Sequence, residues 1–121
     1  MTRILVVDDS PTETHVLRTM LEKHGYQVSV ATDGETGIKR AQEETPDVIL
    51  MDIVMPGVNG FQATRKLSKD PATAAIPIVI ISTKDQDTDR IWAKRQGAKD
   101  YITKPVTEKD LIAKVRSALG G

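Results

Sequence analysis

The chain contains five short runs of apolar or β-branched residues, separated by longer segments of mixed polarity. The runs cover residues 3–7, 27–31, 48–51, 78–81 and 100–103. Three of them are almost continuously apolar rather than alternating, which is typical of strands that are covered on both faces. The pattern therefore predicts five strands of a parallel sheet.

The segments between the predicted strands place apolar residues three or four positions apart, which is the spacing of one helix face. The clearest examples are Val16, Leu17, Met20 and Leu21, and near the end of the chain Leu111, Ile112, Val115 and Leu119. Each predicted strand is therefore followed by a helix, which gives a (βα)5 order.

Residues that favour helix ends stand at the boundaries of these segments. The run Ser10-Pro11-Thr12-Glu13 offers an N-cap, a proline in the first turn and a capping-box glutamate, so we expect the first helix to begin there. His24-Gly25 should close that helix, with the glycine in the left-handed conformation. The other helices are expected to begin near residues 32–35, 59, 87 and 107–110; the third should stop before Asp70-Pro71 and the fourth at Gln96-Gly97.

Strands that alternate with helices define an α/β fold. Because strand–helix–strand crossovers are right-handed, the expected architecture is an open, doubly wound five-stranded parallel sheet. In such sheets, ligands bind outside the carboxyl ends of the strands, where the strand order reverses. The residues that follow the predicted strands are therefore the first candidates for a functional site.

Length and charge narrow the class of protein. The 121 residues suffice for one domain over positions 1–121, and 17 basic side chains balance 17 acidic ones. A balanced charge argues against nucleic-acid binding, and no apolar run approaches the ~20 residues of a membrane-spanning helix. The chain has no cysteine, which excludes a thiol nucleophile and a Cys-ligated zinc. We expect a cytoplasmic protein that binds neither nucleic acid nor membrane.

Four of the predicted strands are followed, or ended, by acidic, hydroxyl or lysine side chains that could take part in binding or catalysis. These residues are Asp8 and Asp9, Asp52, Ser82 and Thr83, and Lys104. Since the carboxyl ends of parallel strands share one edge, these side chains can meet in one pocket. Three carboxylates would repel one another there unless a cation intervened, and oxygen ligands of this kind suit Mg²⁺. Asp8 and Asp9 are the candidate metal ligands.

The remaining groups are those of phosphoryl transfer. An ammonium such as that of Lys104 can bind a phosphate oxygen, and the Ser82 hydroxyl can donate to another. A carboxylate can accept a phosphoryl group as an acyl phosphate, and Asp52 lies alone on a central strand between the acidic pair and the lysine. Asp52 is therefore the candidate nucleophile.

These residues and their order resemble the signature of response-regulator receiver domains. The resemblance covers the whole chain and rests on Asp8-Asp9-Ser10, the run from Val48 to Gly57, Ser82 and Lys104-Pro105. Three further stretches are similar to single-domain receivers of the twitching-motility kind. They are residues 9–13, 59–65 and 94–98.

The resemblance implies a flavodoxin-like sheet of order 2-1-3-4-5 and a phosphorylation switch. Asp52 would accept a phosphoryl group from the phosphohistidine of a histidine kinase. Mg²⁺ would lie on Asp9, Asp52 and the backbone carbonyl of Val54, and Asp8 would act mainly through the water shell of the metal. The Lys104-Pro105 bond is often cis in this family.

The resemblance also implies how the switch is read. Ser82 and Lys104 would bind the phosphoryl oxygens, and Tyr101 matches the rotating aromatic residue of the family. The sequence itself adds a cluster of basic residues on and after the fourth helix, Arg90, Lys94, Arg95 and Lys99, for which a solvated helix face is the plainer interpretation. If the cluster instead binds a partner, a downstream target protein would bind the face of the fourth helix, fifth strand and fifth helix. Plainer interpretations stay open: Tyr101 as a half-buried ring, Thr83 in place of Ser82, and Asp8-Asp9 as a mere strand end and helix cap.

Several functions compete with this interpretation. The chain could be a phosphate sink for a shared kinase or an unphosphorylated adaptor. A flavodoxin-like carrier shares the fold, but Asp8-Asp9 would repel the phosphate of its cofactor. An aspartyl phosphatase would need an added segment to hold a substrate, so we expect a switch protein rather than a turnover enzyme. No output domain is expected after the fifth helix, so the signal should pass through another protein. The sequence identifies neither the kinase nor the target protein. It also does not determine the lifetime of the phosphorylated state or the oligomeric state.

Overall fold

Five strands alternate with five helices in a computed structural model of the chain, which describes residues 1–120. The strands are β1 (Arg3–Val7), β2 (Gln27–Ala31), β3 (Val48–Met51), β4 (Ile78–Ser82) and β5 (Asp100–Thr103). The helices are α1 (Pro11–Glu22), α2 (Gly34–Glu44), α3 (Gly60–Lys69), α4 (Asp87–Gln96) and α5 (Glu108–Ala118). The predicted alternation is confirmed, and β4 extends one residue beyond its apolar run to include Ser82.

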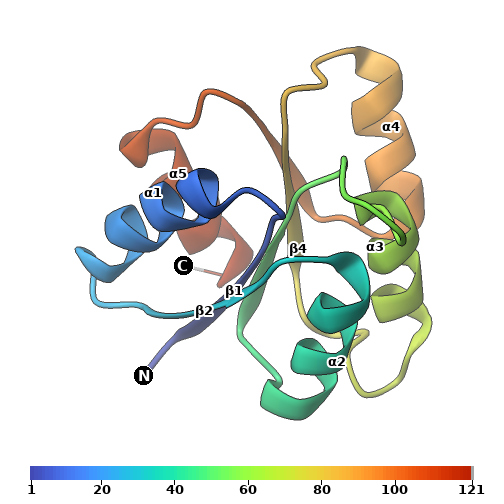
Figure 1. Cartoon of the computed structure of the whole chain (residues 1–121), viewed down its shortest axis with the longest axis horizontal. Helices are drawn as coiled ribbons and strands as arrows, with labels where there is room; N and C mark the ends of the chain where they lie inside the picture. The colour runs from blue at the N-terminus through green and yellow to red at the C-terminus, as the bar shows by residue number, and fades with distance from the viewer. Residues whose placement is uncertain (121) are drawn as a thin grey trace.

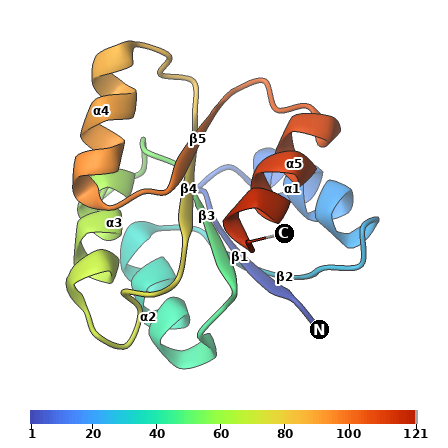
Figure 2. The same cartoon turned by 180° about the vertical axis from the view of Figure 1, so that it is seen from behind.

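The strands form one parallel sheet of order β2-β1-β3-β4-β5, as expected. Figure 1 shows α1 and α5 on one face of this sheet and α2, α3 and α4 on the other. The view from behind in Figure 2 gives the same three layers. The order reverses between β1 and β3, so the edge beyond these two strands is where a ligand site is expected.

The central strands are buried on both faces, which explains their continuous apolar runs. Leu5 and Ile49 belong to the core cluster under α2, α3 and α4. Their neighbours Ile4 and Leu50 belong to the cluster under α1 and α5. Successive residues of one strand thus fill two separate cores, and each position in the strand must be apolar.

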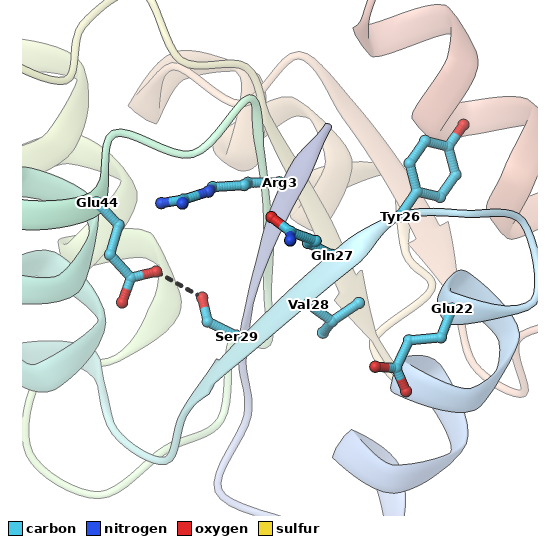
Figure 3. Close-up of a pocket in the computed structure, with 7 residues that line it drawn as sticks. All are labelled: Arg3, Glu22, Tyr26, Gln27, Val28, Ser29 and Glu44. Carbon is cyan, nitrogen blue, oxygen red and sulfur yellow. Dashed lines mark hydrogen bonds between the residues drawn. The ribbon is translucent and has the colours of Figure 1, made fainter. Parts of the chain in front are cut away.

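The edge strand β2 is less buried than the central strands and is partly protected by side chains. Arg18 of α1 donates from Nη2 to the outward carbonyl of Val28 at 3.0 Å. Figure 3 shows a pocket along this strand, in which the Ser29 hydroxyl donates to Glu44 at 2.8 Å. Arg3 and Gln27, the first residues of β1 and β2, also line it, so the pocket lies away from the carboxyl ends of the strands.

The helix ends follow the predicted residues with one difference. Asn59 and Gln62 form a capping box at the start of α3, and Gly97 closes α4 with φ 110°. The first helix ends at Glu22 rather than at His24-Gly25, because the Leu21 carbonyl accepts the His24 amide at 3.0 Å and turns the chain toward β2. Gly25 is left-handed, with φ 85°, in the turn that follows.

Two further features bear on the expectations from the sequence. The Lys104–Pro105 peptide bond is cis, as the family resemblance implies. Among residues 1–120, each helix is too short or too polar to cross a bilayer.

Candidate functional site

The register of the sheet brings the first and third strand ends together. Val7 pairs with Met51 across β1 and β3, so Asp8 and Asp52 follow at neighbouring positions. The Asp52 amide donates to the Val7 carbonyl at 2.9 Å, which continues the strand pairing as far as the phosphoacceptor candidate. Residues 44 positions apart in the chain are therefore fixed side by side by backbone hydrogen bonds.

Three carboxylates meet at this edge of the sheet. Oxygen atoms of Asp8, Asp9 and Asp52 all lie within 4.8 Å of one another. Asp8 and Asp52 are buried, whereas Asp9 is exposed to solvent. Hard oxygen donors in a cluster that is open on one side suit Mg²⁺, which keeps part of its water shell in proteins. The residues present therefore fit a magnesium ion.

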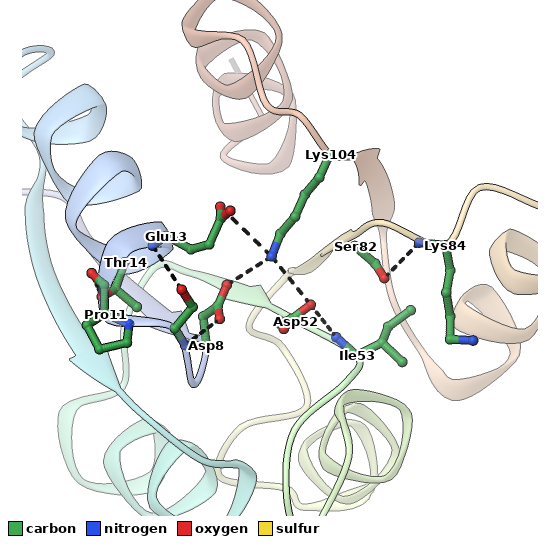
Figure 4. Close-up of polar contacts among 10 residues, drawn as sticks. Asp8, Pro11, Glu13, Thr14, Asp52, Ile53, Ser82, Lys84 and Lys104 are labelled. Carbon is green, nitrogen blue, oxygen red and sulfur yellow. Dashed lines mark hydrogen bonds and ion pairs between the residues drawn. The ribbon is translucent and has the colours of Figure 1, made fainter.

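Lys104 provides the positive charge within this cluster. Its Nζ lies 3.2 Å from Asp8 Oδ2, 3.8 Å from Asp52 Oδ1 and 3.9 Å from Glu13 Oε2 (Figure 4). Burial lowers the pKa of Lys104, but Asp52 and Asp8 outweigh that effect and hold the pKa above its ordinary value. Lys104 is therefore a permanent cation at neutral pH.

Asp52 has an environment that opposes its negative charge. Burial, followed by the negative charge of Asp8, raises the pKa of the Asp52 carboxyl to about 6. Lys104 and the Ile53 amide, which donates to Asp52 Oδ1 at 2.9 Å, act in the opposite direction. The site thus holds more negative charge than its own cation neutralises, which favours a further cation.

The raised pKa of Asp52 makes the stability of the metal-free protein depend on pH. The folded protein binds this proton more tightly than the unfolded chain, so the stabilisation is complete below about pH 4 and is lost as the pH rises through about 6. We expect the unfolding free energy of Asp52→Asn, relative to the parent, to rise by about 2 kcal/mol across this window. Urea denaturation in EDTA at several pH values measures the difference, and a constant difference would contradict it.

Ser82 and Tyr101 both contact the loop between β4 and α4. Ser82 is buried at the end of β4, and its Oγ accepts the Lys84 amide at 3.2 Å, whereas Thr83 is exposed. The Tyr101 hydroxyl donates to the Lys84 carbonyl at 2.7 Å. The Arg90 guanidinium lies 5.0 Å from the centre of the Tyr101 ring. Both side chains singled out for a switch are therefore attached to the same loop residue.

Two further residues, Val54 and Glu13, lie close to the acidic cluster in the sequence or in the structure. Val54 follows Asp52 by two residues and is 61% exposed, so it lies at the surface beside the site. The capping box predicted for Glu13 is wrong, because the Ser10 amide donates instead to Asp8 Oδ1 at 2.9 Å. Ser10 is the N-cap as expected, and its Oγ accepts the Glu13 amide. The contact of Glu13 with Lys104 was missed, since no local pattern connects residues 91 positions apart.

Comparison with known proteins agrees with this geometry. The model of the family described as response regulator receiver domain matches residues 4–116. The chain belongs to this family. Receiver domains are signalling switches of two-component systems; they take phosphoryl groups from histidine kinases and bind Mg²⁺ through acidic residues.

Individual relatives align with all or nearly all of this receiver domain. It is 60% identical over 121 residues to protein PilH of Pseudomonas aeruginosa, with 100% of both chains aligned. It is 45% identical to the response regulator PleD of Caulobacter vibrioides, over 95% of this chain but only 25% of that protein. These likenesses confirm the family and the closer resemblance to a single-domain regulator.

Solved structures give the same result for the fold. The chemotaxis protein CheY4 of Vibrio cholerae superposes with a TM-score of 0.93 at 28% identity, covering 98% of this chain and 99% of that chain. The response regulator domain of Thermotoga maritima CheB gives a TM-score of 0.89 at 34% identity, covering 100% and 98%. The flavodoxin-like fold predicted from the sequence is confirmed.

Proposed function

We propose that Asp52 accepts a phosphoryl group from the phosphohistidine of a histidine kinase. An oxygen of the Asp52 carboxylate attacks phosphorus, the phosphorus–nitrogen bond breaks, and the imidazole nitrogen keeps the electron pair and takes up a proton from solvent. The product is an acyl phosphate on Asp52. The observation that carries this proposal is the position of Asp52 directly after β3, within 4.8 Å of carboxylate oxygens of Asp8 and Asp9 and 3.8 Å from the Lys104 ammonium.

Asp9, Asp52 and the backbone carbonyl of Val54 are the proposed ligands of the Mg²⁺ ion. Asp8, which is buried and bound to Lys104, would act mainly through the water shell of the metal. A bound Mg²⁺ would supply positive charge that lowers the repulsion between an anionic donor and the acidic site. The exposure of Asp9 leaves that side of the cluster accessible to metal and donor.

Ser82 and Lys104 are the proposed ligands of the phosphoryl oxygens. The Ser82 hydroxyl already accepts the Lys84 amide, so a turn of this side chain toward Asp52 would release the loop at that point. Tyr101 is hydrogen-bonded to the carbonyl of the same residue and would reorient as the loop moves. Phosphorylation can shift the equilibrium between the two conformations only to the extent that one of them binds the phosphoryl group more tightly than the other.

The surface formed by α4, β5 and α5 is the proposed contact for a downstream target protein. Tyr101 and Arg90 link α4 to β5, and Arg90 donates from Nη2 to the Thr103 hydroxyl at 2.8 Å. A change at the loop after β4 would therefore alter this surface. The likeness to PilH supports an output in motility or chemotaxis-like control, with a phosphate sink for a shared kinase as the second candidate.

Incubation with acetyl phosphate and Mg²⁺, followed by intact mass measurement, tests the proposal. We expect the parent to gain the mass of one phosphoryl group and Asp52→Asn to gain none. Asp47→Asn is a matched control, because Asp47 lies at the opposite end of β3 and accepts the Arg3 amide at 2.8 Å. An unmodified parent, or modification of Asp52→Asn to the same extent, would overturn the proposal.

A further inference from the structure

The first turn of α1 leaves one carboxylate free to reach into the site. Ser10 caps this turn by accepting the Glu13 amide at 3.3 Å, while its own amide donates to Asp8 Oδ1. In a complete capping box, the Glu13 side chain would bind that Ser10 amide. Because Asp8 occupies the amide, the Glu13 carboxylate extends toward Lys104 instead (Figure 4).

Lys104 is shared between three carboxylates from three different segments. Asp8 is the nearest, at 3.2 Å, and Asp52 and Glu13 lie at 3.8 and 3.9 Å on either side of the ammonium. The Lys104 side chain is 12% exposed and that of Glu13 is 43% exposed. Glu13 therefore acts on the lysine from the solvent side, opposite the phosphoacceptor candidate.

We propose that Glu13 is a positioning residue that competes with the phosphoryl group on Asp52 for the Lys104 ammonium. In the resting protein Glu13 holds Lys104 toward α1. When a phosphoryl group is present, its oxygens take Lys104 from Glu13. This inference rests on the proposed phosphorylation of Asp52 and adds a residue that sets the balance between the two states.

The competition predicts that Glu13 lowers the affinity of the site for a phosphoryl group. A contact made only in the resting state stabilises that state and lowers the affinity for any group that must displace it. Partly exposed ion pairs are weak, so removing the Glu13 charge should tighten phosphoryl-group binding about two- to five-fold. Among residues 1–120, the Glu13 carboxylate is paired with Lys104 alone, so the effect should reach the phosphoryl group through Lys104.

Binding of beryllofluoride, an analogue of the phosphoryl group, at saturating Mg²⁺ tests the proposal. We expect Glu13→Gln to bind beryllofluoride about two- to five-fold more tightly than the parent, as followed by NMR titration. Glu22→Gln is the matched control: it removes the same charge from α1, where Glu22 lies 3.8 Å from Arg18, and should bind like the parent. Urea denaturation establishes that each variant is folded.

Glu13→Asp separates the contact with Lys104 from the local negative charge. Aspartate keeps the charge on the first turn but is one methylene shorter, so the competition predicts that it binds nearly as tightly as Glu13→Gln. An affinity of Glu13→Gln that is unchanged or weaker overturns the inference, and so does a Glu13→Asp variant that binds like the parent. If the parent itself binds no beryllofluoride with Mg²⁺, the proposed phosphorylation fails instead.

Discussion

Replacing Lys104 with methionine is expected to lower the unfolding free energy of the metal-free protein by about 3 kcal/mol at pH 7. The Lys104 side chain is 12% exposed, and its ammonium lies within 4 Å of Asp8, Asp52 and Glu13. Methionine keeps most of the side-chain volume, so the loss should come from leaving buried carboxylates without their cation. Urea denaturation in EDTA measures the change.

Two comparisons separate this effect from a general loss of charge. Lys114→Met removes a lysine from α5 whose partner Asp110 lies 3.9 Å away at the surface, and should change stability by less than about 0.5 kcal/mol. Adding Mg²⁺ should stabilise Lys104→Met more than the parent, because the metal replaces part of the missing positive charge. Equal stability of parent and Lys104→Met without metal would contradict the electrostatic account of the site.

Replacing Gly60 with alanine is expected to destabilise the protein by about 2 kcal/mol and to slow phosphorylation of Asp52. Gly60 is the first residue of α3, and its amide donates to the Ile53 carbonyl at 2.9 Å. A methyl group there would overlap the Asp52 carbonyl oxygen. Alanine favours helices by about 1 kcal/mol over glycine, but overlap with backbone outweighs that gain. Urea denaturation and acetyl phosphate kinetics measure the two effects.

Gly25→Ala provides the comparison for Gly60→Ala. Gly25 has φ 85°, and a methyl group added there would meet no neighbouring atom within 4 Å, so the change should cost about 1 kcal/mol through backbone strain alone. Since Gly25 lies in the turn before β2, phosphorylation of Asp52 should keep the parent rate. If Gly60→Ala is as stable as the parent and is phosphorylated at the same rate, the close approach of α3 to the Asp52 backbone does not constrain residue 60 or the phosphorylation of Asp52.

The architecture could be predicted because each central strand is marked in the sequence by a continuous run of apolar residues. A central strand between two layers of helices must be apolar at successive positions, as Ile4 and Leu5 or Ile49 and Leu50 are. The parallel arrangement then places Asp8 and Asp52 at one edge, so the acidic cluster could be expected before the structure was known.

The missing parts depend on contacts that sequence spacing does not encode. Glu13 fits a capping box locally, but Asp8 competes for the Ser10 amide, and that competition exists only once β1 and α1 are in place. The expected end of α1 is two residues too late because the Leu21 carbonyl accepts the amides of both His24 and Tyr26, which turns the chain before Gly25 is reached. The roles of Ser82 and Tyr101 in signalling stay predictions, since one conformation shows their contacts with Lys84 and no movement.

The contact between Arg18 and the Val28 carbonyl has a consequence for how the molecule behaves when concentrated. A bare outer strand invites another chain to extend the sheet, which is a common route to aggregation. With one outward acceptor already bound to a guanidinium, and Glu22 lying 3.8 Å from that same arginine, an incoming strand would have to displace a charged side chain before it could pair. We therefore expect this margin of the sheet to resist intermolecular β-pairing.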